Sequence, residues 1–517
     1  MSAQRNTYPI IDLFAGPGGL GEGFLSSVDT KGRFRFRDSV SIERDNFSHQ
    51  TLLLRHFLRA FGERGFPKEY YTYLDGKISR EALFELYPEQ LRHAEESALR
   101  ISLGKEEHDR VRGIIDERLK GENKWALIGG PPCQAYSLVG RSRMMNNPDF
   151  QEDERHFLYR EYLKIIADHS PPVFVMENVK GLLSAKVKGE PVITRILADL
   201  SKPGEALADK NESLGYRLYS LSEEGEMTSD ADPRQFLVKA EEYGVPQARH
   251  RMFIVGIRGD IDIVPRQLQR STPPTVEETI GMLPKVRSGL SRQDSLEAWK
   301  SVISEFDKSA LAGHLNGHKY AKDVVSEVRL ALDEIARNPL ERSSSKYPAR
   351  SNSPHKAVQS LYDDRLTTLT SHEARGHMPS DLHRYLFSAA FTAHAKRSPK
   401  LSDFPDFLLP EHKNVARGQA GEMFSDRFRV QKKDQHSTTV TSHISKDGHY
   451  FIHYDPAQCR SLTVREAARL QTFPDNYKFE GPRTAQFHQI GNAVPPFLAG
   501  QIAEIIAEVL DSMPDSD

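Results

Sequence analysis

Short apolar runs alternate with amphipathic, helix-like segments along the first half of the chain. Between the runs lie stretches such as residues 157–166, where apolar side chains recur at helical spacing. The strand-like runs are found at residues 8–14, 39–42, 127–128, 173–176 and 252–255. Strands that alternate with helices predict an α/β fold with a mostly parallel, doubly wound sheet.

The pattern changes near residue 265. Residues 265–300 and 341–356 are rich in Ser, Pro and Arg, which is typical of linkers or surface loops. From there to about residue 460 the chain reads as irregular, and helical periodicity returns at 463–470 and again at 497–510.

A chain of 517 residues is too long for one compact core, so we expect more than one domain. The pattern predicts an α/β domain over residues 1–264 with a helical insertion at 56–124. It predicts a smaller, irregular domain over 265–460 and a C-terminal segment, 461–517, that returns to the first domain.

Composition narrows the class of protein only slightly. The 70 basic and 72 acidic residues give a net charge of −2, which argues neither for nor against nucleic acid. Two cysteines exclude a disulfide framework and a four-thiolate zinc site, which favours an intracellular setting. The polar N-terminus and the lack of an eighteen-residue apolar run predict neither a signal peptide nor a membrane span.

One of those cysteines, Cys133, stands at the end of a predicted strand. It follows the sequence Gly-Gly-Pro-Pro at 129–132, which comes directly after the apolar run 125–128. Prolines fix the local backbone, so the thiol would be aimed at the carboxyl edge of the sheet, where ligands bind. A free cysteine is more commonly a small buried apolar residue, and the other motifs must decide between the two interpretations.

A Gly-rich turn follows the first predicted strand, over residues 14–21. Glycines there let a ligand approach the backbone, and the start of the next helix offers free N–H groups. Glu43 ends the second strand, where a carboxylate can accept hydrogen bonds from ribose hydroxyls. The combination favours a nucleotide-like cofactor over a plain tight turn.

Two further strand ends carry charged side chains. Glu177 follows the run 173–176, and a carboxylate there can have a raised pKa and act as an acid; the alternative is an ordinary surface glutamate. Arg249 and Arg251 precede the run 252–255 and would share one face of a strand. Their forked donors suit a carbonyl or phosphate oxygen, although a solvated basic edge would look the same.

The segment 265–460 contains a short repeat and a group of histidines. Residues 367–372 recur as 438–443, but six residues are too few to indicate a duplicated domain. His372, His377 and His383 have no cysteine nearby and their spacing fits no metal motif, so we expect no metal site.

Taken together, these segments resemble the DNA cytosine-5 methyltransferases, in content and in order. The resemblance is dense over 8–260 and 437–510 and thin between them. The matching segments are the cofactor motif 12–19, the nucleophile motif 130–134, the carboxylate motif 177–179, the paired-arginine motif 247–251, the late structural motif 465–474 and the last motif 489–494.

The resemblance implies a base-flipping mechanism for methylation of cytosine at C5. Cys133 would attack C6 of the flipped base, and Glu177 would hold N3 and the exocyclic amine. Arg251 would bind the O2 carbonyl as charge develops, with Arg249 supporting the same region.

The implied cofactor is S-adenosylmethionine, bound by a Rossmann-like sheet. Arg44 departs from the family pattern, since relatives often carry an aromatic residue there, and Asp75 is the assigned partner of the adenine amine. The cofactor residues implied by the resemblance are Phe14, Ala15, Gly16, Gly18, Gly19, Leu20, Glu43, Arg44, Asp75, Pro131, Leu158, Asn492 and Val494.

The implied partner is double-stranded DNA, with residues 265–460 as a target-recognition domain. Residues 134–143 would form a mobile loop that closes on DNA, and 367–369 form a hypothetical second DNA-facing turn. The residues expected to contact DNA are Gln134, Ser137, Arg141, Arg143, Thr438, Thr439 and Val440.

Several alternatives stay open at this point. One branch of the family acts on transfer RNA, and a DNA-binding regulator with a silent active site would share the fold. A dinucleotide dehydrogenase would explain the Gly-rich turn and Glu43 but not the motif around Cys133. We expect a cytoplasmic enzyme, monomeric on DNA and associated with the nucleoid, that belongs to a restriction-modification or related defence system.

Overall fold

The computed structural model describes residues 7–104, 106–132, 154–187, 189–207, 214–227, 231–410 and 426–514.

The centre of the molecule is an eight-stranded sheet with the order β3-β2-β1-β4-β5-β10-β8, in which β9 also pairs with β10. Strands β1 to β5 are parallel, and β10 runs antiparallel to β5, β8 and β9. The strands are β1 (Tyr8–Leu13), β2 (Phe36–Ile42), β3 (Ala98–Leu99), β4 (Ala126–Gly129), β5 (Val173–Val179), β8 (Tyr216–Tyr219), β9 (Leu237–Lys239) and β10 (His250–Arg258). This confirms the predicted doubly wound α/β fold.

The strand order reverses between β1 and β4, which is where open α/β sheets bind ligands. Leu13 pairs with Ile42 on one side and with Gly129 on the other, and Gly129 pairs with Met176. The carboxyl ends of four parallel strands therefore lie side by side at this edge. Arg251, near the start of the antiparallel β10, pairs with Val179 and joins the same edge.

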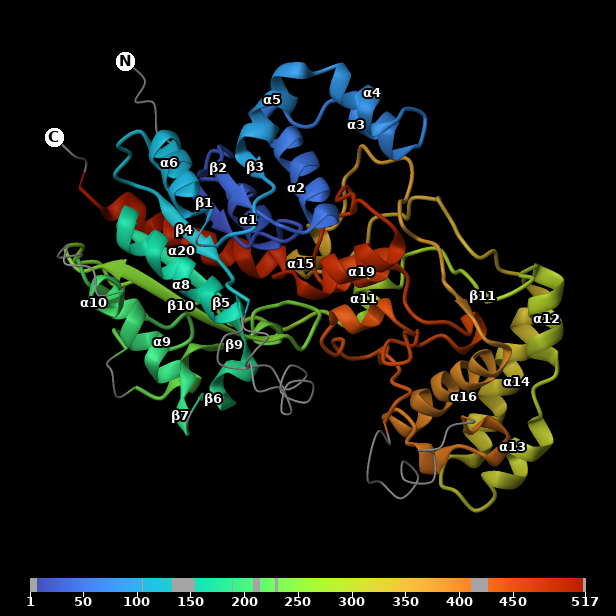
Figure 1. Ribbon diagram of the computed structural model, residues 1–517. Coiled ribbons are helices and arrows are strands. Elements are labelled where there is room, and N and C mark those ends of the chain that lie inside the picture. Colours follow the sequence, from blue (N-terminus) through green and yellow to red (C-terminus); the bar gives the residue numbers. More distant parts are fainter. Residues whose placement is uncertain are drawn as a thin grey trace.

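Helices cover both faces of the sheet (Figure 1). On one face α1 (Gly19–Leu25) and α20 (Pro496–Ser512) pack in a common apolar core with β1, β4, β5 and β10. On the other face lie α6 (His108–Leu119), α8 (Glu154–His169) and α9 (Val192–Ser201). In the part of the chain that the structure describes, Arg483–Ser512 is the one stretch apolar and long enough to span a membrane, and 72% of its most apolar window is buried inside the protein.

A helical insertion follows β2 and projects beyond the edge of the sheet (Figure 1). It consists of α2 (Asn46–Arg59), α3 (Lys68–Leu74), α4 (Arg80–Glu85) and α5 (Pro88–Ser97), which share an apolar cluster of their own. The first helix begins before residue 56 because the Asp45 side chain accepts the Ser48 N–H and caps it.

A second lobe, which we call the helical lobe, has a separate apolar core (Figure 1). Its helices are α12 (Leu296–Ser304), α13 (Lys308–His314), α14 (Ala321–Arg337) and α16 (Pro379–Ala395). The prediction that residues 265–460 are irregular is therefore wrong for these stretches. Helix α14 follows an ordinary amphipathic pattern, with Val324, Val328 and Ile335 buried on one side.

Short elements complete the chain between and beside these parts. They are β6 (Lys186–Val187), β7 (Glu190–Pro191), α10 (Pro203–Leu207), α11 (Val276–Ile280), β11 (Gly289–Leu290), α15 (Lys356–Gln359), β12 (Gly376–His377), α18 (Val464–Leu470) and α19 (Arg483–Asn492). Buried ion pairs hold the segment around α18: Arg469 pairs with Asp475 at 2.6 Å and Arg460 with Glu466 at 2.6 Å.

Candidate active site

A cavity of about 730 Å³ opens at the carboxyl edge of the sheet, where β1, β2, β4 and β5 end and α19 approaches. Most of the residues predicted to hold the cofactor line it. They are Phe14, Ala15, Gly16, Gly19, Leu20, Glu43, Arg44, Pro131, Leu158, Asn492 and Val494. Glu177 lines the same cavity, so the predicted cofactor and base residues share one space.

The Glu43 carboxylate is fixed by two backbone amides. The N–H of Gly16 donates to Oε2 at 2.9 Å, and the N–H of Asp45 donates to Oε1 at 2.6 Å. Burial raises the pKa of Glu43, while these hydrogen bonds act in the opposite direction. The carboxylate is thus a preoriented acceptor at the end of β2, suited to a ribose hydroxyl.

The Gly-rich turn has a conformation that requires glycine at two positions. Gly16 and Gly18 have φ values of 59° and 91°. Gly19 lies so close to the neighbouring chain that a Cβ would be 2.5 Å from the carbonyl oxygen of Val494. Gly18 packs against Leu52 and the Tyr477 hydroxyl, so its contribution is to the shape of the turn.

Asp12 is a cavity residue that sequence analysis missed. Its side chain is buried, lines the cavity from β1, and its Oδ2 has no hydrogen-bond partner among the described residues. Burial and the nearby Glu43 raise its pKa well above the usual value. An acidic residue inside an otherwise apolar strand was the signal that could have revealed it.

These groups fit the expected cofactor, which combines positive charges, ribose hydroxyls and an adenine ring. Asp12 offers an unpaired buried acceptor and Glu43 an oriented one. The apolar side chains of Ile42, Ile101 and Leu103 supply a wall for a ring. The donor set therefore suits S-adenosylmethionine.

The assignment of Asp75 to the adenine is wrong. This residue lies at the end of α3, where it forms an ion pair with Lys77 at 2.8 Å and accepts a hydrogen bond from Thr367 Oγ1 at 3.0 Å. The segment after β3 approaches the cavity instead, and Ser102 lies there between Ile101 and Leu103.

Glu177 and Arg251 form an ion pair at the cavity, with Arg251 Nε 3.1 Å from Glu177 Oε1. A Cβ on Gly130 would lie 2.8 Å from Glu177 Oε2, so the carboxylate rests directly on that glycine. Burial raises the pKa of Glu177 in spite of Arg251 and Arg249 nearby. A carboxyl group with a raised pKa can donate a proton as well as accept a hydrogen bond.

Arg249 has different hydrogen-bond partners from Arg251, which pairs with Glu177. Its guanidinium is buried and donates to the carbonyl oxygens of Val440 at 3.0 Å and Gly491 at 3.2 Å. The predicted role of Arg249 beside the base is therefore indirect in this structure: the side chain ties together two segments next to the cavity.

Cys133 lies outside the described residues, as do Gln134, Ser137, Arg141 and Arg143. The two residues before Cys133, Pro131 and Pro132, line the cavity. Asn178 Nδ2 donates to the Pro131 carbonyl at 3.3 Å and connects this segment to the end of β5.

The three residues predicted to touch DNA at 438–440 differ in exposure. Thr438 is exposed and Thr439 is half-buried. Val440 is 0% exposed and belongs to an apolar cluster with Val276, so the prediction that it contacts DNA is wrong. Its N–H and carbonyl are both used inside the protein.

The three histidines considered as metal ligands, His372, His377 and His383, form hydrogen bonds inside the protein. His372 contacts Thr463 Oγ1 at 3.0 Å and the Pro284 carbonyl at 2.8 Å, and His383 contacts the Val302 carbonyl at 2.7 Å. His377 lies 3.3 Å from the Tyr385 hydroxyl. No group of three or more His, Cys, Asp or Glu side chains in the described ranges could hold a metal ion.

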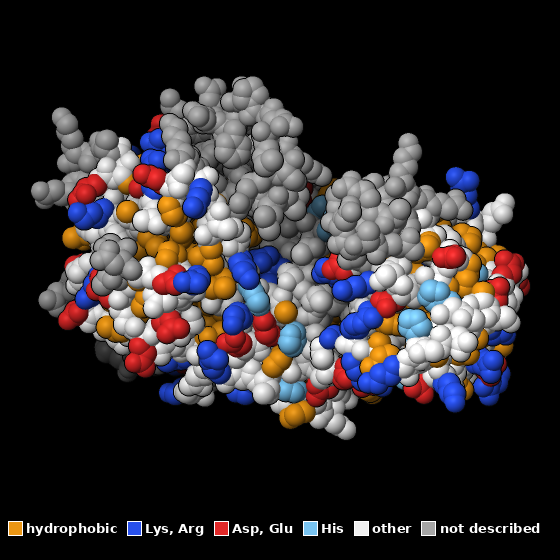
Figure 2. All heavy atoms as spheres, turned by 90° about the horizontal axis from the view of Figure 1, so that it is seen from below, with side chains coloured by type: hydrophobic (Ala, Val, Ile, Leu, Met, Phe, Trp, Pro, Cys, Tyr) orange, Lys and Arg blue, Asp and Glu red, His pale blue; other side chains and the backbone are white. Residues whose placement is uncertain are grey.

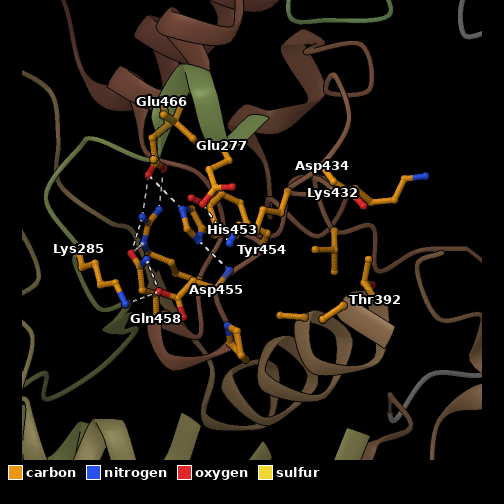
Figure 3. Close-up of a pocket in the computed structure, with 18 of the residues that line it drawn as sticks. Glu277, Lys285, Thr392, Lys432, Asp434, His453, Tyr454, Asp455, Gln458 and Glu466 are labelled. Carbon is orange, nitrogen blue, oxygen red and sulfur yellow. Dashed lines mark hydrogen bonds and ion pairs between the residues drawn. The ribbon is translucent and has the colours of Figure 1, made fainter. Parts of the chain in front are cut away.

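A second cavity, of about 490 Å³, lies between α11, α16 and the segment 453–460 (Figure 3). Most of its charged side chains form ion pairs with one another, such as Lys433 with Glu277 and Lys396 with Asp434. Lys285 lies 3.0 Å from Asp455, and Figure 3 shows these two side chains together, below Glu466. Glu466 forms a buried ion pair with Arg460. We interpret it as a seam between the helical lobe and the rest of the chain, apart from the cofactor residues.

Comparison with known proteins gives a consistent result. The family described as C-5 cytosine-specific DNA methylase matches residues 103–508. Type II methyltransferase M.Bpa9945I of Bacillus paralicheniformis is 31% identical over 524 residues, covering 97% of this chain and 99% of the relative. Type II methyltransferase M.AgeI of Thalassovita gelatinovora is 28% identical over 532 residues, covering 96% and 98%.

Among the solved structures with a similar fold, one matches over nearly the whole chain. It is described as a DNA modification methyltransferase encoded within a prophage of E. coli, with a TM-score of 0.53 and 18% identity, and the match covers 98% of this chain and 100% of that one.

Proposed function

Since the chain belongs to the C-5 cytosine-specific DNA methylase family, we propose that it methylates a cytosine flipped out of a specific duplex DNA sequence, through a covalent bond between Cys133 and C6 of the base. The family itself defines the enzyme class, DNA (cytosine-5-)-methyltransferase, and the cofactor, S-adenosylmethionine.

The observation that carries the proposal is Glu177, which lines the same cavity as Glu43 and Pro131 and forms an ion pair with Arg251. A protonated Glu177 would donate to N3 of the cytosine while its second oxygen accepts from the exocyclic amine. Arg251 would bind O2 of the base. These contacts draw electrons toward N3 and O2 and make C6 susceptible to attack by the Cys133 thiolate.

Covalent addition is needed because C5 of an intact cytosine is a weak nucleophile. After the Cys133 sulfur bonds to C6, the electron pair reaches C5, which takes the methyl group. Loss of the C5 proton and departure of the thiolate then restore the aromatic ring. S-adenosylmethionine, when bound, supplies the methyl group on a sulfonium centre.

The protein would bind the cofactor through hydrogen-bond acceptors and apolar side chains that line the cavity. Glu43, held by the amides of Gly16 and Asp45, would orient the ribose. Asp12 would face a positive charge, and the backbone of Gly19 next to Val494 would close the cavity around the methionine part.

We assign DNA recognition to the segment 265–460, which includes the helical lobe. A space-filling view supports a cleft for a polyanion: Lys and Arg side chains border the hollow between the two halves of the molecule (Figure 2). Thr438 is exposed and available for DNA, whereas Thr439 is half-buried and donates from Oγ1 to the Ala248 carbonyl.

The relatives place the enzyme among restriction-modification methyltransferases, and double-stranded DNA is the substrate of that class. We propose that the protein acts in the cytoplasm on the nucleoid, as a monomer on DNA, beside a cognate nuclease or related defence system. RNA methylation is the alternative within the same chemistry.

One experiment tests the proposal. The protein is incubated with labelled S-adenosylmethionine and plasmid DNA, and 5-methylcytosine is then mapped by sequencing. We expect methylation at one short recurring sequence and none with Cys133→Ala. Methylation of transfer RNA but not of DNA, or equal activity of Cys133→Ala, would contradict it.

A further inference from the structure

The DNA-side turn at 437–440 is connected to the cofactor loop at 491–494 by a row of buried side chains. The N–H of Val440 donates to Gln247 Oε1 at 2.8 Å, and Gln247 Nε2 donates to Gln471 Oε1 at 2.6 Å. Gln471 Nε2 in turn donates to the carbonyl oxygen of Ala493. Both glutamines are 0% exposed.

Arg249 makes a second connection between the same two segments. It donates to the carbonyl oxygens of Val440 and Gly491, so both polar groups of Val440 reach residues that hold the cofactor loop. The two backbones also touch: a Cβ on Gly491 would lie 2.2 Å from the Ser442 nitrogen. The turn and the loop are therefore braced in one relative position.

Each end of this brace is next to a proposed binding surface. Thr438 is exposed on the DNA side. On the other side Asn492 and Val494 line the cofactor cavity, and Val494 packs directly on Gly19. The glutamine pair thus lies between the residues proposed for DNA and those proposed for the cofactor.

A glutamine suits each position because its amide accepts on one side and donates on the other. All bonds in the row point the same way, from Val440 to Ala493, and hydrogen bonds aligned in a dry interior strengthen one another. The structure shows the row intact, and movement of either the turn or the loop would break it.

Building on the function proposed above, we infer that Gln471, acting through Gln247, is a positioning residue that makes the binding of DNA and of the cofactor cooperative. DNA that holds the Thr438 turn favours the intact row and so favours the cofactor-binding position of the 491–494 loop. By thermodynamic reciprocity, bound cofactor then raises the affinity for DNA by the same factor.

Gln431 provides a matched control on the other side of the turn. It is 1% exposed, and its Oε1 accepts from the Thr438 N–H at 3.0 Å and Oγ1 at 3.1 Å. Its Nε2 donates to the Tyr450 carbonyl, away from the cofactor loop. Gln431→Met and Gln471→Met remove the same chemical group from the same neighbourhood, but only the second breaks the row.

The test measures the dissociation constant of S-adenosylhomocysteine by calorimetry, with and without a saturating duplex that carries the mapped target site. In the unmodified protein we expect DNA to tighten binding by a factor of about 5 to 150, the usual range of coupling between two sites. In Gln471→Met the factor should fall below about 2, whereas Gln431→Met should keep the unmodified value and lose only DNA affinity.

Two further variants separate a loss of folding stability from a loss of coupling between DNA and cofactor binding. If Gln471→Met does not fold, Gln471→Asn, which is too short to span Gln247 and Ala493, takes its place with the same expectation. The Gln247→Met, Gln471→Met double variant should show no further loss of coupling, because both substitutions break one row.

Three outcomes overturn the inference: no coupling in an unmodified protein that methylates DNA, unchanged coupling in Gln471→Met, or equal loss in Gln431→Met. A protein that methylates no DNA at all would instead contradict the function proposed above.

Discussion

Replacing Glu43 by Gln tests whether the carboxylate at the end of β2 holds the cofactor. Both carboxylate oxygens accept backbone N–H groups, from Gly16 at 2.9 Å and from Asp45 at 2.6 Å. A glutamine has one oxygen and one NH₂ group, so one of the two amides would face a donor and lose its bond. Charge on the remaining acceptor is lost as well.

A hydrogen bond to a charged group contributes about 1.5–3 kcal/mol, and 1.4 kcal/mol corresponds to a tenfold change in an equilibrium constant. Loss of one such bond and of the charge at the ribose therefore predicts that Glu43→Gln weakens S-adenosylhomocysteine binding by about 10- to 100-fold. Asp75→Asn should change it by less than about twofold, because Asp75 pairs with Lys77 and Thr367 elsewhere.

Isothermal titration calorimetry of the purified variants without DNA measures this directly. A thermal melt without ligand should show that both variants fold. The reasoning would be refuted if Glu43→Gln bound within about threefold of the unmodified protein, or if Asp75→Asn lost as much affinity as Glu43→Gln.

Two other predictions concern groups around the same cavity, and a third concerns the turn at 438–440. Since burial raises the pKa of Glu43, cofactor affinity should be highest above that raised pKa and fall as the pH drops through it; Glu43→Gln should lose this part of the pH dependence and keep only the part that comes from Asp12, whose pKa is also raised. Gly130→Ala places a Cβ 2.8 Å from Glu177 Oε2 and should lower kcat at least about tenfold with little change in cofactor affinity; an unchanged kcat would contradict the contact. Val440→Ala should destabilise the fold by about 1–3 kcal/mol in denaturant unfolding, while Thr438→Ala should leave stability within about 0.5 kcal/mol and weaken DNA binding in a gel-shift assay.

The sheet and much of its site could be predicted from the sequence because the signals are local. Apolar runs of strand length end directly in chemistry-bearing residues: β1 runs into the Gly-rich turn, β2 ends before Glu43, and β5 contains Glu177. Parallel strands bring those ends to one edge, so their order along the chain was enough to place Glu43 and Glu177 in one cavity.

Asp75 and Val440 show where local signals fail. Asp75 follows a plausible Leu-Asp-Gly sequence, but α3 carries it to a surface shared with Thr367, a contact between residues far apart in the chain. Val440 follows two threonines, and this polar context suggests an exposed, DNA-facing turn. Packing in one apolar cluster with Val276 and Ile444 nevertheless buries Val440 completely. Only the three-dimensional structure supplies such long-range packing.

In the helical lobe, the amphipathic pattern of α14 is visible in the sequence, whereas α16 and the glutamine row give no clear local signal. Helix α16 is buried on most of its surface, so its sequence lacks a clear polar face. Gln247 and Gln471 look like polar residues in two separate motifs, and their 2.6 Å hydrogen bond joins segments more than two hundred positions apart.

The central claim is that Cys133 attacks a flipped cytosine at C6 while Glu177 and Arg251 hold the ring. A duplex carrying 5-fluorocytosine at the mapped target tests it most directly, because fluorine cannot leave C5 as the proton does and the adduct cannot resolve. We predict a protein–DNA complex that survives denaturing electrophoresis, requires S-adenosylmethionine for full accumulation, and is absent with Cys133→Ala. Failure of the unmodified enzyme to form that complex, while it still methylates the ordinary duplex, would contradict the covalent mechanism.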